Sequence, residues 1–303
     1  MPKLFDILIG SPAQRQQRKR ITVIAILVTA ALIVSSLAAF CIAALFEETE
    51  EPKRDYKEDL DQTLLYTITS SVRTGDLILV NKNHPISFAE NSSLSFMSTG
   101  NGYGLRDNSL EANPKAIEAL NSMVADLNTN VEAANLVVLT AYRSKERQDS
   151  LNNGTPGGCS DYHTGLSFEL KEKTNDDNYI ELDRLDKYDW LYKNAHKYGF
   201  IVRYPENCKS ETGISDYAYV FRYVGVPHAT YIYENGLCLE SYLDLLRTSH
   251  KSAAPLEITS TDSVSYKVFY SEKVEIEIDA DAVFEISGDN MNGYIITVCE
   301  SMK

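Results

Sequence analysis

The stretch that decides the fold is Leu136-Val-Val-Leu-Thr-Ala-Tyr-Arg-Ser144. Its first four residues are apolar, which predicts a short buried strand that leads into the polar Tyr142-Arg-Ser144. Outward from this stretch, further short apolar strands are predicted at residues 77–80, 166–170 and 217–223.

Helices are predicted between these strands. After Pro114, apolar residues recur at spacings of three and four, which is typical of an amphipathic helix. A second helix is predicted over residues 186–198, ended by Gly199, and a third over residues 237–246. Residues 91–104 and 152–158 read as loops. Short strands and helices without regular alternation indicate the α+β class.

The pattern changes after a linker at residues 250–255. Residues 256–303 contain alternating apolar and polar residues, most clearly in Val274-Glu-Ile-Glu-Ile278, and Ser287-Gly-Asp-Asn290 reads as a turn. About 48 residues are marginal for independent folding. We therefore predict a small C-terminal β module that packs on the preceding domain.

The amino-terminal end predicts a membrane anchor. Residues 21–46 form an uncharged run of 26 residues, preceded by basic residues 15–20 and followed by acidic residues 47–51. A helix of this length can cross a bilayer, and the basic side stays inside. We expect a cytoplasmic tail (1–20), a transmembrane helix (21–46), an acidic stalk (47–75) and an extracytoplasmic remainder. A cleaved signal peptide is the alternative, but its apolar region is shorter.

Charge and cysteine content narrow the functional classes. The net charge is −14, and residues beyond position 46 hold 24 basic and 42 acidic side chains, which argues against nucleic-acid binding. Outside the cytoplasm disulfides are allowed. Four cysteines lie there: Cys159, Cys208, Cys238 and Cys299. They are either buried free thiols or form one or two bridges, and the sequence cannot choose among the three pairings.

Several segments, in order, resemble the VanY-type D-alanyl-D-alanine carboxypeptidases, which are zinc peptidases acting on peptidoglycan stem peptides. The resemblance covers roughly residues 76–245. It rests on Leu79–Lys82 with His84-Pro85, Thr140–Ser144 with Glu146 and Gln148, Ser160–Leu166, Trp190-Leu191, Asn194-Ala195, Tyr198–Ile201, Arg203–Pro205, Thr212-Gly213, Phe221–Gly225 and Leu239-Glu240. It implies a small mixed domain over residues 76–249, with an antiparallel sheet flanked by helices.

The zinc site of the family is where this chain departs. The family's two His ligands and its Asp ligand fall on Tyr162, Val220 and Glu169, and its general base, a Glu, falls on Tyr217. A catalytic zinc needs three protein ligands and one open position. A valine has no donor atom, and a tyrosine must lose a proton with a pKa near 10. The resemblance therefore implies a member without the usual metal ligands and base, so no metal cofactor is expected.

Neighbouring residues offer two alternatives. A one-residue shift would bring His163 and Asp216 into the site, although Thr164-Gly165 and Phe221-Arg222 keep the family register. Neighbours in an extended segment face opposite sides, which argues against the shift. A nucleophile formed from Ser160 or Cys159 with His163 lacks the Gly-x-Ser-x-Gly elbow.

These patterns predict a membrane-anchored, extracytoplasmic pseudoenzyme that binds a stem peptide or another wall or envelope component. In the family, the arginine at Arg143 binds substrate, and guanidinium groups form bidentate bonds with carboxylates. The expected binding residues are Arg143, Gln148, Ser160, Tyr162, Asp216 and Tyr217. Two other hypotheses remain: an active D,D-carboxypeptidase with zinc in a shifted site, and a structural wall-associated protein.

Overall fold

The computed structural model describes residues 63–88, 93–174, 178–214 and 217–300. All of them belong to one compact unit that begins at Asp61. The expected tail and transmembrane helix, and the stalk up to residue 62, lie outside the described residues. Within the described ranges, no helix has the length and apolar character needed to cross a membrane.

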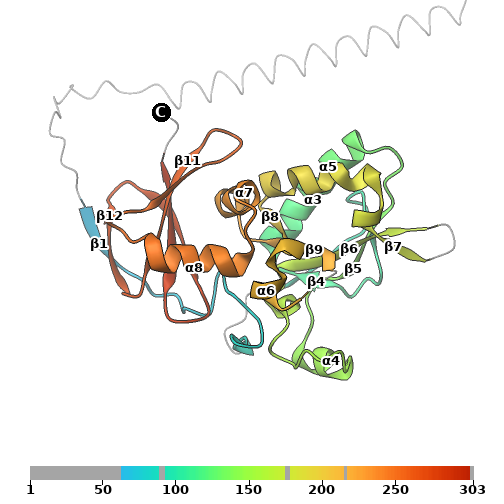
Figure 1. Cartoon of the computed structure of the whole chain (residues 1–303), viewed down its shortest axis with the longest axis horizontal. Helices are drawn as coiled ribbons and strands as arrows, with labels where there is room; N and C mark the ends of the chain where they lie inside the picture. Colours follow the sequence, from blue (N-terminus) through green and yellow to red (C-terminus); the bar gives the residue numbers. More distant parts are fainter. Residues whose placement is uncertain (1–62, 89–92, 175–177, 215–216, 301–303) are drawn as a thin grey trace, which may run out of the picture. The chain divides into compact units, whose positions relative to one another are not determined.

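A mixed sheet forms the centre of the first part of this unit (Figure 1). Its strands lie in the order β3-β5-β6-β9-β8, with β7 beside β6. Their bounds are Gly104–Leu105 (β3), Leu136–Thr140 (β5), Ser167–Lys173 (β6), Tyr179–Glu181 (β7), Phe200–Tyr204 (β8) and Tyr217–Tyr223 (β9). The pairs are antiparallel except for β3 and β5, which are parallel. The α+β prediction is confirmed, and the antiparallel sheet is confirmed apart from that short pair.

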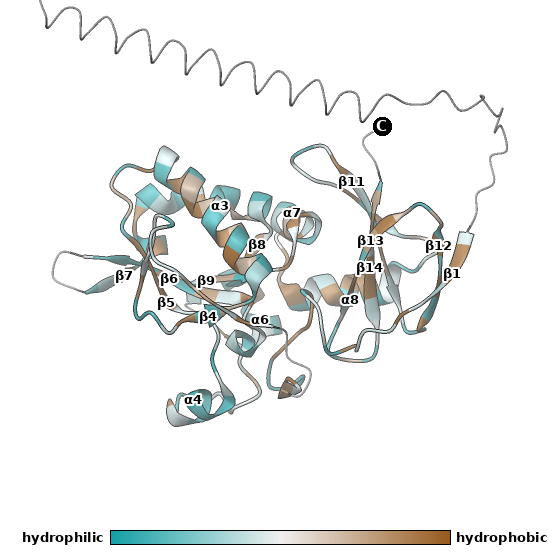
Figure 2. Cartoon of the chain, turned by 180° about the vertical axis from the view of Figure 1, so that it is seen from behind, coloured by the Kyte–Doolittle hydropathy of each residue, from teal (hydrophilic) through white to brown (hydrophobic). Residues whose placement is uncertain are grey.

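Helix α3 (Pro114–Asn130) covers one face of this sheet, and Figure 2 shows hydrophobic stripes along it. It begins where predicted, because the Asn113 side chain accepts the backbone N–H of Lys115 and Pro114 fits the first turn. The apolar residues of the predicted stripe are fully buried against sheet residues such as Phe168 and Phe221. Their spacing thus places one face of the helix in the core.

The remaining helices are short. They are α4 (Lys145–Ser150), α5 (Asp189–Asn194), α6 (Lys209–Thr212), α7 (Val226–Glu234) and α8 (Leu239–Ser249), with 3₁₀ turns η2 (Asp161–Thr164), η3 (Leu182–Arg184), η4 (Asp186–Tyr188), η5 (Ala195–Tyr198) and η6 (Glu206–Cys208). The helix predicted over residues 186–198 is divided into η4, α5 and η5, and it ends at Gly199 with φ +83°. Helix α7 was not predicted, and α8 begins two residues later than expected.

The C-terminal β module has the strand order β10-β11-β14-β13. Its strands are β10 (Leu256–Thr259), β11 (Ser265–Ser271), β12 (Glu275–Asp279), β13 (Val283–Gly288) and β14 (Tyr294–Glu300). The predicted turn at residues 287–290 starts too early, since Ser287 and Gly288 belong to β13. The short strands β2 (Ser95–Phe96) and β4 (Glu111–Ala112) pair separately.

The expected acidic stalk is wrong from residue 63 onward. Strand β1 (Thr63–Thr67) pairs antiparallel with β12 in full register, from Thr63 opposite Asp279 to Thr67 opposite Glu275. Ile68, which follows β1, is buried in the core of the β module with Phe269 and Ile296. These residues are therefore a part of the folded unit rather than a solvated spacer.

The strand predicted at residues 77–80 is also wrong, although these residues are buried as expected. Their backbone groups bond to side chains and turns instead of to a neighbouring strand. The Arg222 guanidinium donates to the carbonyl of Ile78, the Ser287 hydroxyl accepts the N–H of Leu77, and Asp289 O accepts the N–H of Leu79. Buried backbone groups need partners of some kind, and here long-range contacts supply them.

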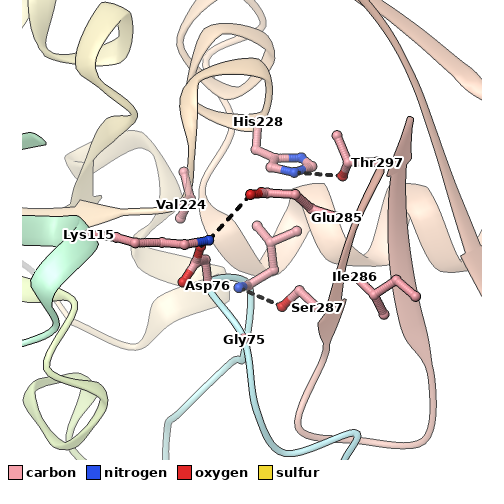
Figure 3. Close-up of a pocket in the computed structure, with 10 residues that line it drawn as sticks. Gly75, Asp76, Lys115, Val224, His228, Glu285, Ile286, Ser287 and Thr297 are labelled. Atoms are coloured by element: carbon pink, nitrogen blue, oxygen red, sulfur yellow. Dashed lines mark hydrogen bonds and ion pairs between the residues drawn. The ribbon is translucent and has the colours of Figure 1, made fainter. Parts of the chain in front are cut away.

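The β module shares a hydrophobic core with the preceding domain. Leu243 and Leu246 of α8 pack with Val268 of β11 and Ile295 of β14. The junction also carries polar contacts, shown in Figure 3: Lys115 lies 3.3 Å from carboxylate oxygens of both Asp76 and Glu285. The expected packing of the module on the domain is therefore confirmed, with one continuous core between them.

His228 is the buried polar centre of this junction. One ring nitrogen lies 2.7 Å from the Tyr242 hydroxyl. The other lies 3.0 Å from Thr297 Oγ1, as Figure 3 shows. Burial lowers the pKa of the imidazole to about 3. The histidine is thus neutral in the folded protein, and it joins α8 to β14.

We predict that this histidine makes folding sensitive to acid. In the unfolded chain its pKa is near 6.5, so between pH 6.5 and 3 the unfolded state binds the extra proton. Stability is therefore fully present above pH 6.5 and falls by about 1 kcal/mol per pH unit below it. Urea unfolding at pH 7 and pH 5 should show a smaller loss in His228→Gln than in the parent. An equal loss in both proteins would contradict this role.

Candidate functional site

A cleft of about 920 Å³ opens at one edge of the main sheet. Its walls come from the segment that follows β5, from η2, β6, β8 and β9, and from residues 80–83 and 210–214, the latter including part of α6. Every described residue that the sequence predicted for the site, apart from Val220, lines it: Arg143, Gln148, Ser160, Tyr162, Glu169 and Tyr217. Asp216 lies outside the described residues. The fold therefore brings together residues that are up to 74 positions apart.

Arg143 is held in place from several sides. Its backbone N–H donates to Tyr162 O, its Nη1 donates to Gln148 Oε1 at 2.7 Å, and its guanidinium carbon lies 4.4 Å from the centre of the Tyr162 ring. Burial lowers the pKa of the guanidinium without removing its charge at neutral pH. Arg143 therefore lines the cleft as a cation whose position is set by its neighbours.

Gln148 positions Arg143, and its own amide groups are already hydrogen-bonded within the protein. It is 1% exposed, and its amide Nε2 donates to Asn153 Oδ1 and to Thr155 O while its oxygen accepts from Arg143. Ser144 caps the short helix α4 that carries Gln148, with its hydroxyl accepting the N–H of Arg147. The predicted binding role of Gln148 is therefore best described as orienting the arginine.

A buried ionic network lies beneath the cleft, and no role was predicted for its central residue from the sequence. Asp161 accepts from Arg203 Nε at 3.1 Å and from Arg222 Nη1 at 2.8 Å, and both guanidinium groups are fully buried. Arg203 also forms a bidentate pair with Glu240. Burial alone would raise the pKa of the Asp161 carboxyl, but the two guanidinium groups hold it below its usual range. The sequence feature that could have pointed to this network is the presence of Arg203 and Glu240 within the motif segments.

Tyrosines form the remaining wall. Tyr217 is 45% exposed, and its ring centre lies 5.5 Å from that of Tyr219 and 6.3 Å from that of Tyr204. Lys171 Nζ lies 4.2 Å from the centre of the Tyr219 ring. Such rings offer apolar surface with a polar edge, which suits contacts with peptide or sugar.

The comparisons with known proteins follow the same segments. Residues 109–226 match the profile of the VanY family, described as D-alanyl-D-alanine carboxypeptidase. The predicted resemblance to this family is confirmed over these residues.

Two relatives and one solved structure are similar to larger parts of the chain. A D-alanyl-D-alanine carboxypeptidase of Enterococcus faecium is 28% identical over 84% of this chain and 86% of its own length. One from Enterococcus faecalis is 28% identical over 59% of this chain and 71% of its own length. The structure of the vancomycin resistance D,D-dipeptidase VanXYg with a D-Ala-D-Ala phosphinate analogue has a TM-score of 0.68. It is 24% identical and covers 79% of this chain and 99% of its own. That likeness supports the fold.

The three VanY metal positions do not fit a zinc ion here. Val220 is 1% exposed, has no donor atom, and lies opposite Glu169 in the β6–β9 pair. Glu169 already accepts from Thr140 Oγ1 at 2.9 Å and lies 3.7 Å from Lys171 Nζ. Burial, with the nearby Glu169 carboxylate, raises the pKa of Tyr162 well above its usual value, so the phenol stays protonated. Glu169 is the one anionic donor among the three positions, too few for a catalytic zinc site.

The shifted site is not built from His163 in the VanY domain. The side chain of His163 is buried, with Nε2 accepting from Gly158 N at 3.0 Å and Nδ1 lying 2.5 Å from Arg143 O. Burial lowers the pKa of this imidazole. Both ring nitrogens thus bond to backbone groups that shape the cleft wall. Within the described ranges, no cluster of three or more His, Cys, Asp or Glu side chains has metal-binding geometry.

Proposed function

We propose that this protein is a non-catalytic VanY-type domain that binds D-alanine-terminated peptidoglycan stem peptides in the Arg143 cleft. The observation that carries the proposal is that the substrate-binding features of the VanY site are present while its metal-ligand and base positions hold other residues. The cleft, the positioned arginine and its supporting glutamine are present, whereas Tyr162, Val220 and Tyr217 stand at the ligand and base positions.

The chemistry of the cleft favours binding over hydrolysis. Peptide hydrolysis in a zinc peptidase needs a metal-activated water and a base that accepts its proton. A protonated Tyr162 and an apolar Val220 provide neither. In contrast, a carboxylate can form bidentate hydrogen bonds with a guanidinium such as Arg143, and it needs no metal to do so. The tyrosine wall can contact the rest of the peptide.

The substrate class comes from the relatives. The names of the two enterococcal proteins describe carboxypeptidases for D-Ala-D-Ala, and the VanXYg structure holds a D-Ala-D-Ala analogue. Because Arg143 and its supports are present here, we extend the recognition of a terminal D-alanine carboxylate to this chain. The residues that line the cleft do not favour the alternative hypothesis of an active D,D-carboxypeptidase.

We also propose that the domain is anchored to the membrane and faces the cell wall. The support is the uncharged run at residues 21–46 with basic residues before it and acidic residues after it. An outward-facing domain would meet the stem peptides that the cleft is proposed to bind.

The expected outcome is a purified full chain with no stoichiometric zinc and no release of D-alanine from a D-Ala-D-Ala peptide. Elemental analysis of protein prepared without a metal-binding tag, and an assay for free D-alanine, measure the two quantities. Release of D-alanine that a chelator abolishes would overturn the proposal. If one zinc is bound per chain, its loss in Asp216→Asn would point to the shifted site.

A further inference from the structure

Two of the four predicted extracytoplasmic cysteines meet beside the cleft. Cys208 ends η6 and Cys238 caps the start of α8, thirty positions further along the chain. The side chain of Cys208 is in contact with Cys238, and both cysteines are free thiols in this structure. Both side chains are buried, at 5% and 0% exposure.

The two backbone segments are also held together independently of the sulfur atoms. Asn207, which precedes Cys208, donates from its Nδ2 to Gly236 O at 2.8 Å. Disulfides form where two cysteines already lie within a few ångströms and their backbones can approach. The other two cysteines are placed differently: Cys159 lines the cleft, and Cys299 lies on β14 opposite Tyr266 and Val283.

We propose that Cys208 and Cys238 are joined by a disulfide that fastens the cleft wall at residues 209–214 to helix α8. The oxidant is an organic disulfide, either a small molecule or a protein. One cysteine thiolate attacks it, forming a mixed disulfide and releasing one thiol. The second cysteine thiolate then attacks the sulfur of the first cysteine in this mixed disulfide, which forms the Cys208–Cys238 bond and releases the other half of the oxidant as a second thiol. The protein pair loses two electrons and the oxidant gains them.

The surroundings of the pair determine when this reaction occurs. Burial, together with the contact with Cys238, raises the pKa of Cys208 to about 12. Because the thiolate is the nucleophile, the folded dithiol exchanges slowly, and the bond forms during folding or after local opening. Once formed, a buried disulfide is equally protected from external reductants.

The consequence of the bond is a fixed cleft wall, whatever the cleft binds. Helix α6 is a single turn, and its residues Ser210, Glu211 and Thr212 line the cleft. A helix this short has little stability of its own, so its position depends on tertiary contacts. The disulfide ties its start to α8, which carries Glu240 of the buried ionic network.

Thiol mapping of the full chain, refolded with glutathione disulfide, tests the proposal. Free thiols are alkylated in denaturant without reductant, and the peptides are identified by mass spectrometry. We expect a Cys208 peptide linked to a Cys238 peptide, while Cys159 and Cys299 carry the label. Labelling of both Cys208 and Cys238, or a link from either one to Cys159 or Cys299, would overturn it.

Thermal unfolding gives a second measurement. Closing a loop of about thirty residues is expected to raise Tm by roughly 5–15 °C. Reductant added before refolding should remove this difference in the parent and in the control Cys299→Ser, and should have no effect in Cys208→Ser. Equal Tm values with and without reductant in the parent would contradict the stabilising role. If Cys208→Ser does not fold, the thiol mapping of the unchanged chain decides.

Discussion

Replacing Asp161 with asparagine is expected to lower the free energy of unfolding by about 3–5 kcal/mol. For a folded unit of this size, this corresponds to a fall in Tm of roughly 6–20 °C. The effect is large because the substitution removes one carboxylate from between two fully buried guanidinium groups, Arg203 and Arg222.

The partners of Asp161 explain why the loss is not compensated. Arg203 keeps its bidentate pair with Glu240. Among the described residues, Arg222 keeps only backbone partners, since its Nε donates to Tyr223 O and its Nη2 donates to Asp76 O and Ile78 O. A buried cation without a counter-charge costs several kcal/mol, because the protein interior cannot solvate it as water does. The bonds from Arg222 to Asp76 O and Ile78 O also hold the backbone of residues 76–78 in place. We therefore expect this segment to become less ordered in the variant as well.

Urea unfolding followed by circular dichroism measures the change, and two variants calibrate it. Lys193→Met breaks an exposed ion pair with Asp189 and should cost no more than about 0.5 kcal/mol. Ser167→Ala removes the hydroxyl that donates to Asp161 and should cost about 1 kcal/mol. If Asp161→Asn behaves like Lys193→Met, the network is not a determinant of stability.

Replacing Arg143 with alanine is expected to weaken binding of a D-Ala-D-Ala-terminated peptide by about 10–150-fold. This range is that of a hydrogen bond to a charged group, about 1.5–3 kcal/mol. Arg143 lines the cleft with its position fixed by Gln148 and Tyr162, so little ordering of the side chain is needed when a carboxylate arrives. Arg143→Lys should recover only part of the affinity, since an ammonium group cannot form the bidentate contact.

Calorimetry with two probes separates the carboxylate contact from other effects. The probes are acetyl-Lys-D-Ala-D-Ala and the same peptide with a C-terminal amide. The amide should bind weakly to the parent, and Arg143→Ala should not weaken it further. Arg147→Ala is the matched control, because Arg147 is exposed on α4, which follows Arg143 in the chain, and it does not line the cleft. Equal affinity of the parent and Arg143→Ala for the acid would remove Arg143 from the site.

The sequence alone predicted much of the fold where local patterns decide it. The apolar spacing after Pro114 predicted α3, and the runs at residues 136–139 and 217–223 predicted β5 and β9. Such elements bury one stripe or face, so their apolar residues recur at a regular spacing that can be read from consecutive residues. The substitutions at the VanY ligand positions Tyr162, Glu169 and Val220 were also visible without a structure, because the motif segments around them fix their register.

Tertiary structure decided what depends on residues far apart in the chain. Leu77–Val80 has the composition of a strand, yet its backbone groups bond to Arg222 and to residues 287–290. His163 does not act as a metal ligand because its ring nitrogens contact the backbone of Gly158 and Arg143. Likewise, only folding brings Cys208 beside Cys238 and Asp161 between two arginines. Residue type sets which contacts a side chain can make, but the meeting of distant segments selects the ones that it does make.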